Sequence, residues 1–350
     1  MLTIVSLFVL FAAACVFSFF EEKKNRMLVV AYAAAIVILV FIAGLRPIGI
    51  DGDSNNYLKV YYGNAEDFVE ASFVLISQIV SYLFDEPQIL FFIYALLSVP
   101  LKGVAVTRLS DLWFLSLALW LSRYFVLHDM TQIRVSVSAA IFLYSVTFLV
   151  KREKAKYLLC CLLATLFHYS SLALFPLVLL GNAPLSRLWK GFLAGVPILG
   201  FALYSLNINL VYLIPIPYIQ DKLLIYELAR ETGIMGLDEN INLFNPLYLI
   251  KLASFYLVLF KYDLLKEHVP ALSLLLKVWA LSFAAYSVLS FIPALAYRIN
   301  ELLAVVEIIL IPYMVYTVRP VWVGRVAVLL FCGFQFYYTI YVLELLKFSV

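Results

Sequence analysis

Arg46, Asp51 and Asp53 follow directly on a long apolar run, in a short stretch that is rich in glycine. A guanidinium can bind an oxyanion through two parallel hydrogen bonds, and a carboxylate can take a proton from an attacking hydroxyl. The two carboxylates also fit an ordinary turn, and an Asp-x-Asp tripeptide alone is weak evidence for a metal site. The stretch therefore indicates an anion-binding group beside a candidate base, with a turn as the simpler alternative.

Further polar side chains lie where other apolar runs end or break. An arginine in hydrocarbon costs roughly 2.5–3.5 kcal/mol on insertion scales, so each arginine should face protein or water. Several arginines on one side of a membrane would suit a phosphate, because guanidinium remains charged in any environment. The residues concerned, beyond Arg46, Asp51 and Tyr57, are Arg123, His128, Asp129, Arg134, His168, Arg298 and Glu301.

Each of these residues also has a purely structural explanation. Arg298 and Glu301 are three positions apart on one helical face and could neutralise each other. Arg134 could reach the lipid headgroups, and His168 could cap a carbonyl at a helix break. Tyr57 belongs to a set of aromatic side chains that fit either a membrane-interface belt or stacking on sugar rings. The polar residues alone leave both kinds of explanation open.

The elements that must position these residues are membrane helices. The chain has 350 residues, of which 65% are hydrophobic and 13% are charged, whereas about a quarter of an average soluble protein is charged. Apolar runs long enough to cross a bilayer recur throughout, so we predict an all-α, polytopic integral membrane protein. The four cysteines lie inside such runs and are interpreted as buried apolar side chains, not as a disulfide or metal set.

Basic loops orient the helices, because cytoplasmic loops of membrane proteins are enriched in lysine and arginine. The loops 21–26 and 151–156 are basic and are assigned to the cytoplasm. These constraints predict about twelve transmembrane helices, with both ends outside, in a single transmembrane domain over residues 1–350. External loops are expected at about 46–67 and 207–245.

Three parts of this topology need an interpretation of their own. The run 68–84 is predicted to be interfacial or re-entrant, because a crossing there would place Lys102 and the loop 151–156 outside. The run 157–180 is predicted to form two short spans that meet near His168. The runs 112–127 and 133–150 are predicted to meet at an external turn that carries residues 123–134.

Several common site signatures are absent from the sequence. We find no P-loop, Rossmann glycine pattern, zinc signature or nucleophile–base motif. Nothing indicates a nucleic-acid partner. The residues therefore predict an outward-facing cationic cavity suited to a lipid-linked phosphate, in either an enzyme or a transporter.

Four stretches together resemble the EpsG/Wzy family of polysaccharide-repeat polymerases, over about residues 40–315. They are Gly44-Leu45-Arg46-Pro47 with Gly49, Asp51 and Tyr57; Arg123-Tyr124-Phe125 with residues 132–140; Leu166-Phe167-His168-Tyr169-Ser170-Ser171; and Tyr297-Arg298 before a final helix pair. The order and spacing of the stretches carry the resemblance. The chain departs from the family pattern at Ile50, where threonine is usual, and at Gln132, which precedes Arg134 in an altered order.

The resemblance implies a GT-C-like membrane glycosyltransferase in the bacterial cytoplasmic (inner) membrane, with a multi-pass chain and an active site facing the periplasm. Its substrate would be an undecaprenyl-pyrophosphate-linked oligosaccharide, polymerised into O-antigen, capsule or exopolysaccharide with release of undecaprenyl pyrophosphate. Membrane lipid, a chain-length regulator and a flippase are the implied partners. No cofactor and no metal ion are expected, because arginines can replace a cation at the leaving group.

The same resemblance implies roles for the candidate residues. Pyrophosphate would be held by Arg46, Arg134 and Arg298. Asp51 or His168 would orient or deprotonate the acceptor hydroxyl, as catalytic residues. The remaining substrate-binding candidates are Tyr57, Arg123 and Glu301, and Asp129 would position arginines or sugar hydroxyls.

Three other functions fit parts of the same pattern. A flippase or other transporter of lipid-linked oligosaccharide would share the cavity but should show two related halves, and no internal repeat is evident. An O-antigen ligase would share the donor but usually has a larger external loop than residues 207–245. A membrane acyltransferase would use an intramembrane histidine but would not require several outward arginines.

Overall fold

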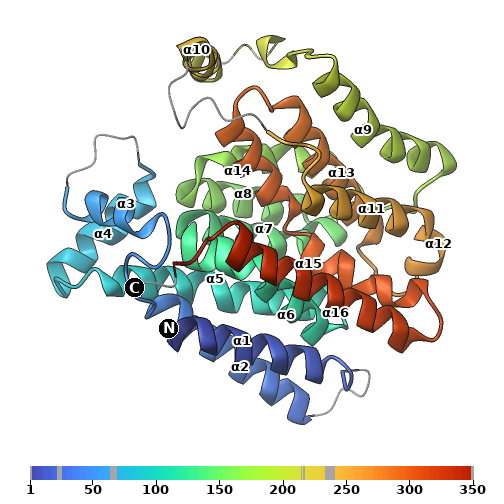
Figure 1. Ribbon diagram of the computed structural model, residues 1–350, viewed down its shortest axis with the longest axis horizontal. Coiled ribbons are helices and arrows are strands. Elements are labelled where there is room, and N and C mark those ends of the chain that lie inside the picture. The colour runs from blue at the N-terminus through green and yellow to red at the C-terminus, as the bar shows by residue number, and fades with distance from the viewer. Residues whose placement is uncertain are drawn as a thin grey trace.

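Helices form the regular structure of this protein in a computed structural model that describes residues 2–21, 26–63, 69–213, 215, 217–232 and 241–347 (Figure 1). Within those residues the β-type pairing is one isolated bridge between Asp51 and Leu346. The predicted loops fall only partly inside the described chain, because 22–25, 64–67 and 233–240 lie outside it. The all-α prediction is confirmed.

Six helical segments of the described chain are long and apolar enough to cross a membrane, which confirms the prediction of an integral membrane protein. The predicted number of spans and the GT-C-like architecture stay predictions. The six segments are α2 (Arg26–Gly44), α5 (Gln88–Leu109), α7 (Ile133–Val150), α9 (Arg187–Ser205), Pro293–Thr317 and Val321–Val342. Shorter apolar helices are α1 (Leu2–Phe17), α4 (Ala71–Leu83), the 3-10 helix η2 (Tyr169–Leu179), α11 (Pro246–Phe260) and α13 (Leu272–Val288).

The remaining elements are subdivisions of these segments or short helices between them. Pro293–Thr317 consists of α14 (Pro293–Ala304), α15 (Glu307–Leu310) and η4 (Ile311–Thr317), and Val321–Val342 of α16 (Val321–Tyr337) and η5 (Tyr338–Val342). The others are α3 (Ser54–Tyr61), α6 (Trp113–Leu119), η1 (Trp120–Thr131), α8 (Lys154–Phe167), η3 (Leu210–Leu213), α10 (Pro217–Thr232) and α12 (Tyr262–Leu265).

Helix α5 lies in the middle of one half of the bundle, packed against α2 and α7, and α7 packs in turn on α8. Small residues allow these close approaches. Gly44 ends α2 against α5, where an added Cβ would lie 2.8 Å from Cα of Phe92. On α7, Ser138 and Ala139 are fully buried, and the hydroxyl of Ser138 donates to the carbonyl of Ala164 on α8 at 2.9 Å. The sequence stretch that begins at Arg46 therefore leaves α2 at a fixed place beside α5.

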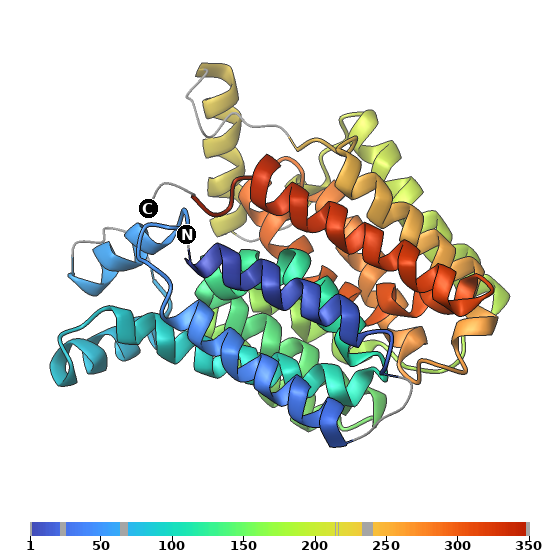
Figure 2. The same cartoon turned by 60° about the horizontal axis from the view of Figure 1, so that its bottom comes forward.

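Both chain ends lie at the same end of the bundle, and α3 and α4 project from that end (Figures 1 and 2). The carboxyl-terminal segment is tied to the stretch after α2, because the Lys347 amide donates to the Ile50 carbonyl at 2.7 Å. Helix α4 contacts α3, α5 and α8 there. The interfacial or re-entrant placement of residues 68–84 stays a prediction.

The turn predicted over residues 123–134 is much shorter than expected, because α6 continues without a break into the π-helix η1 and the chain turns only at Gln132. Its external position stays a prediction. The helix stays inside the bundle because its acid has a buried partner: Lys102 Nζ lies 2.9 Å from both carboxylate oxygens of Asp129. Lys102, expected at the cytoplasmic end of its run, is fully buried in α5. Its expected place on the cytoplasmic side of the membrane stays a prediction.

The predicted break at His168 is confirmed. Helix α8 ends at Phe167, and η2 begins at Tyr169. The Tyr157 hydroxyl donates to the Leu174 carbonyl at 2.8 Å, so η2 folds back along α8. The break places the His168 side chain at the tip of a helical hairpin.

Candidate active site

One carboxylate, Glu70, holds the side chains of two predicted site residues. Glu70 directly precedes α4, His168 stands at the tip of the α8–η2 hairpin, and Arg134 lies in the first turn of α7. Oε1 of Glu70 is 2.7 Å from Nδ1 of His168, and Oε2 accepts a hydrogen bond from Nη1 of Arg134. Glu70 and His168 are buried. Three segments far apart in the chain thus converge on one group.

The ring of His168 has one nitrogen engaged and one without a partner. The carboxylate of Glu70 can only accept, so Nδ1 carries the proton and Nε2 keeps its lone pair. Nε2 is buried and has no hydrogen-bond partner among the described residues. An imidazole held in this way can accept a proton at Nε2.

The charges around this pair set its protonation state. Burial lowers the pKa of His168 most strongly and outweighs the opposing effect of Glu70, while Arg298 and Arg134 lower that pKa further. Burial raises the pKa of Glu70, but the hydrogen bond from His168 and the charge of Arg134 prevail and lower it overall. At neutral pH a neutral imidazole therefore faces an ionised carboxylate.

Arg134 is packed on one side and accessible on the other. Its guanidinium carbon lies 5.5 Å from the ring centre of Tyr57 and 5.6 Å from that of Phe73. The rings and Glu70 fix the guanidinium, and a quarter of the side chain remains exposed. A guanidinium that is fixed and partly exposed can bind an anion without first losing conformational freedom.

Two further charged residues near Glu70, His168 and Arg134 are at least partly exposed, namely Arg298 and Asp53. Arg298 is exposed on α14 and forms no ion pair with any described residue. Burial and the neighbouring Asp51 raise the pKa of Asp53, and the charges of Arg134, Arg298 and Arg46 oppose that rise. The charge of Arg298 lowers the pKa of both Asp53 and His168, so Arg298 lies in the neighbourhood of both.

Arg46 and Asp51 form a buried ion pair next to Asp53. Nε of Arg46 lies 3.1 Å from Oδ2 of Asp51, and Nη1 donates to the Ala43 carbonyl at 2.6 Å. Oδ1 of Asp51 accepts from the amides of Asp53 and Ser54, at 3.0 and 2.8 Å. Both side chains are almost completely buried. These contacts correspond to the turn that the sequence left open as the simpler alternative.

Arg123 and Glu301 lie in a second, interior cluster. Nη2 of Arg123 is 3.3 Å from Oε1 of Glu301, so Glu301 pairs across helices and not with Arg298. Glu307 accepts hydrogen bonds from Tyr124 and Trp279, at 2.8 and 3.0 Å. Its other neighbour is Lys251, whose Nζ lies 2.6 Å from Oε2. This cluster joins η1 to α11, α13, α14 and α15.

Asp129 and His128 occupy the interior near η1. Asp129 accepts from Lys102, Ser98, Ser136 and Trp120, and no arginine is among these partners. Its expected role in positioning arginines or sugar hydroxyls stays a prediction. His128 is fully buried, and neither ring nitrogen has a hydrogen-bond partner in the described chain.

Sequence reasoning missed Glu70 and the interior charges Lys102, Lys251 and Glu307 as site or core partners. A signal was present, because a charged residue inside an apolar run needs a partner in the protein. Glu70 also stands directly before an apolar helix, where the positive end of the helix dipole favours an acid. Within the described chain no three His, Cys, Asp or Glu side chains gather as a metal-ion site. The expectation of no cofactor stays a prediction.

Comparison with known proteins gives one family. The model described as the EpsG family matches residues 29–349, nearly the whole chain. No curated protein and no solved structure matches the chain.

Proposed function

Because the chain belongs to the EpsG family, a Wzy-like family of polysaccharide polymerases, we propose that it polymerises undecaprenyl-pyrophosphate-linked oligosaccharide repeats. The reaction would take place at the periplasmic face of the cytoplasmic membrane. The product would be O-antigen, capsule or exopolysaccharide. The observation that carries this proposal is the Glu70 carboxylate, which holds His168 and Arg134 side by side.

The chemistry requires a base and an anion clamp. A hydroxyl of the acceptor repeat attacks the anomeric carbon of the donor chain and forms the new glycosidic bond. The bond from that carbon to the pyrophosphate oxygen breaks, and undecaprenyl pyrophosphate leaves with the electron pair. The hydroxyl proton passes to a base, and cations stabilise the charge on the leaving oxygen.

Arg134 and Arg298 form the proposed clamp. Arg134 is already fixed by Glu70 and by the rings of Tyr57 and Phe73, so little ordering is needed when the anion binds. Arg298 is exposed and has no ion-pair partner among the described residues, so its guanidinium is available for two hydrogen bonds to phosphate oxygens.

His168 is the proposed base. Its unpartnered Nε2 takes the acceptor proton, and Glu70 stabilises the imidazolium that forms by accepting the hydrogen bond from Nδ1. Asp53, which is half-buried beside the arginines, would orient the acceptor hydroxyl.

The other candidate residues would act through the fold. Arg46 and Asp51 hold the turn that presents Asp53, and their atoms are largely occupied by each other and by backbone groups. Arg123 and Glu301 hold α14 against η1, which fixes the helix that carries Arg298. We therefore assign Arg46, Asp51, Arg123 and Glu301 as positioning residues.

Purified protein in nanodiscs, supplied with lipid-linked repeat extracted from a deletion strain, tests the proposal. Wild type should convert the repeat into a ladder of longer chains, and His168→Ala should reduce the rate by about 10²–10⁴-fold, as expected for loss of a general base. A wild-type protein that leaves the repeat unextended would contradict polymerisation.

The deletion strain separates the proposed function from its rivals. In a strain that makes O-antigen, loss of the polymerase leaves lipid A carrying one repeat, whereas loss of a flippase or a ligase leaves none. In a strain that makes capsule or exopolysaccharide, the corresponding result is lipid-linked single repeats without high-molecular-weight polymer. A polymer of unchanged length in the deletion strain would refute the proposal.

A further inference from the structure

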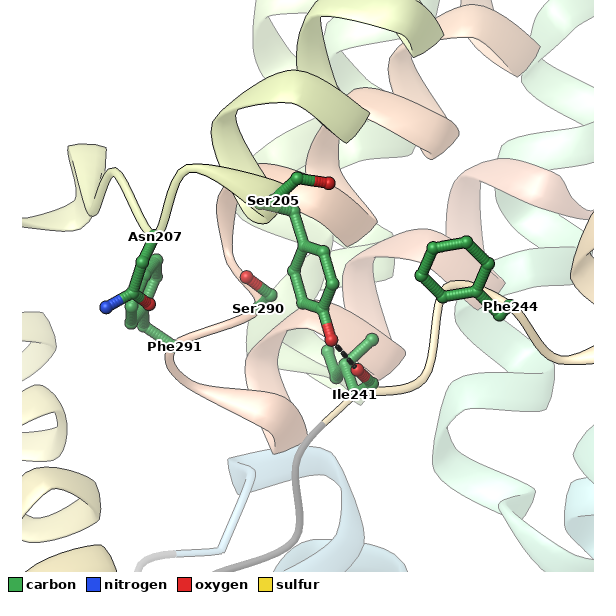
Figure 3. A pocket seen from close by; sticks show the side chains of 7 residues that line it. Ser205, Asn207, Ile241, Phe244, Ser290 and Phe291 are labelled. Carbon is green, nitrogen blue, oxygen red and sulfur yellow. Dashed lines mark hydrogen bonds between the residues drawn. The ribbon is translucent and has the colours of Figure 1, made fainter.

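A pocket of about 480 Å³ opens between the end of α9, the start of α11 and the α13–α14 connection (Figure 3). Its volume is within the roughly 300–1,000 Å³ that is typical of small-ligand sites. Its lining residues do not include Glu70, His168, Arg134, Arg298 or Asp53. The pocket is therefore a separate feature that the proposed chemistry leaves without a use.

The lining combines aromatic rings with neutral polar groups. Tyr204, Phe244 and Phe291 supply the rings, and Ser205, Asn207 and Ser290 supply hydroxyl and amide groups. Figure 3 shows Asn207 and Phe291 on one side, Phe244 on the other, and Ser205 and Ser290 between them. No charged residue of the described chain lines the pocket. Rings for an apolar face and neutral partners for hydroxyls are the chemistry that fits a sugar, whereas a pyrophosphate would need cations.

The pocket walls are held in place by hydrogen bonding and ring packing. The Tyr204 hydroxyl donates to the Ile241 carbonyl at 2.6 Å, which ties α9 to the chain before α11. The ring of Phe244 packs edge-on against Phe201, with centroids 5.0 Å apart. Phe244 nevertheless remains 61% exposed, so one face of its ring is free to contact a ligand.

The pocket is joined to the proposed active site through α14. Ser290 and Phe291 directly precede this helix, and Arg298 lies five residues after its first residue, about 8 Å along the axis at ~1.5 Å per residue. A row of rings packs α11, α13 and α14 together near this connection. The ring centroid of Tyr248 lies 5.2 Å from that of Tyr286. The ring centroid of Tyr286 lies 5.5 Å from that of Tyr297, the residue before Arg298.

We propose that this pocket binds sugar residues of the lipid-linked repeat. The inference rests on the proposed function for the identity of the sugar, but the binding itself does not require turnover. A site of this kind would hold the glycan while Arg134 and Arg298 hold the pyrophosphate, so that binding energy remote from the reacting carbon positions the repeat.

Binding of free oligosaccharide, released by mild acid from the lipid-linked repeat of the deletion strain, provides the test. Saturation-transfer NMR on wild type in nanodiscs should show binding. Phe244→Ala should weaken it about tenfold because a stacked ring is lost, and Asn207→Gly should weaken it by up to about tenfold because the amide's hydrogen bond to a hydroxyl is lost. Glycine suits position 207 because Asn207 has φ of 54°, so the variant removes the amide without straining the backbone.

Two control variants make the result specific. Phe260→Ala removes a phenylalanine that is 81% exposed at the other end of α11, and it should leave binding unchanged. Arg298→Ala should bind oligosaccharide normally while losing polymerisation. The proposal would be overturned if wild type bound no oligosaccharide, or if Phe244→Ala bound it as well as wild type. It would also be overturned if a phospholipid co-purified with wild type and was lost in Phe244→Ala. Active wild-type protein that binds no oligosaccharide would refute the subsite alone, and an inactive protein that binds it would refute the polymerase alone.

Discussion

Nδ1 of His168 lies 2.7 Å from Oε1 of Glu70, although 98 positions separate the two residues in the chain. The same carboxylate holds Arg134 through its other oxygen. The proposed base and one arm of the proposed clamp are thus fixed by one group. Replacing Glu70 should therefore disturb both proton transfer and anion binding.

The pH dependence of Glu70→Gln tests this relationship. Glu70 opposes the burial that lowers the pKa of His168, so loss of its charge should lower that pKa further. The base works only when it is neutral, so activity falls as pH drops through this pKa. In Glu70→Gln the acidic limb of kcat should consequently move to lower pH. The plateau should fall on the order of tenfold, because a hydrogen bond to a charged group is lost.

The double variant Glu70→Gln/His168→Ala is the control for that experiment. If Glu70 assists the base through His168, Glu70→Gln should slow turnover less in the His168→Ala background than in wild type, and the remaining loss should come from the Arg134 contact. An acidic limb that stays in place or moves to higher pH would contradict the assignment of His168 as a base oriented by Glu70.

Arg298→Ala should abolish most of the turnover without unfolding the protein. Arg298 is exposed and pairs with no described residue, so its removal leaves no buried charge behind. Loss of one hydrogen-bond donor to the transition state should lower kcat about 10²–10³-fold. Arg298→Lys should have a kcat between those of wild type and Arg298→Ala, because it keeps the charge but loses the paired hydrogen bonds of the guanidinium. Arg187→Ala, at another exposed arginine, should match wild type in the same polymerisation assay. Normal turnover of Arg298→Ala would remove Arg298 from the clamp.

The helical class and the break at His168 could be predicted from the sequence because both are local. Apolar runs report helices that must bury their backbone in a membrane, and the polar group 167–171 interrupts one of these runs. The sequence could identify His168, Arg134 and Arg298 as candidate site residues, but it could not predict which side chains contact one another. The partner of Glu70 depends on how α4 packs against α7 and α8, which is not written in any local spacing.

Local spacing was also misleading for Glu301. Arg298 and Glu301 are three apart, which favours pairing on an isolated helix. In the bundle, Glu301 is buried and Arg298 is exposed, so Glu301 pairs with Arg123 on a neighbouring helix. Lys102 was interpreted as a signal for the cytoplasmic side, because a lysine near the end of a run normally marks topology. Its partner Asp129 lies 27 positions later, so the pair becomes visible only when α5 and η1 are packed together.

Asp51→Asn and Arg46→Ala should act on stability and not on chemistry. Each leaves the other member of a buried ion pair uncompensated, which costs about 3–5 kcal/mol. Thermal unfolding in detergent should therefore show a clear loss for both variants, while turnover per folded molecule should change much less than in His168→Ala. A stable Asp51→Asn protein without activity would restore Asp51 as the base and overturn the positioning role.

Lys102→Met should destabilise the bundle more than Lys102→Met combined with Asp129→Asn. The single change leaves a fully buried carboxylate without its cation, at a cost of about 3–5 kcal/mol, whereas the double change leaves a neutral amide that can still bond to Ser98, Ser136 and Trp120. The pair fixes η1 on α5, and η1 carries Arg123 to Glu301, so instability should be accompanied by lower turnover even though neither residue touches the proposed substrate. Unfolding midpoints of the two variants decide the matter. If the single variant is as stable as wild type, the ion pair does not hold η1 in place.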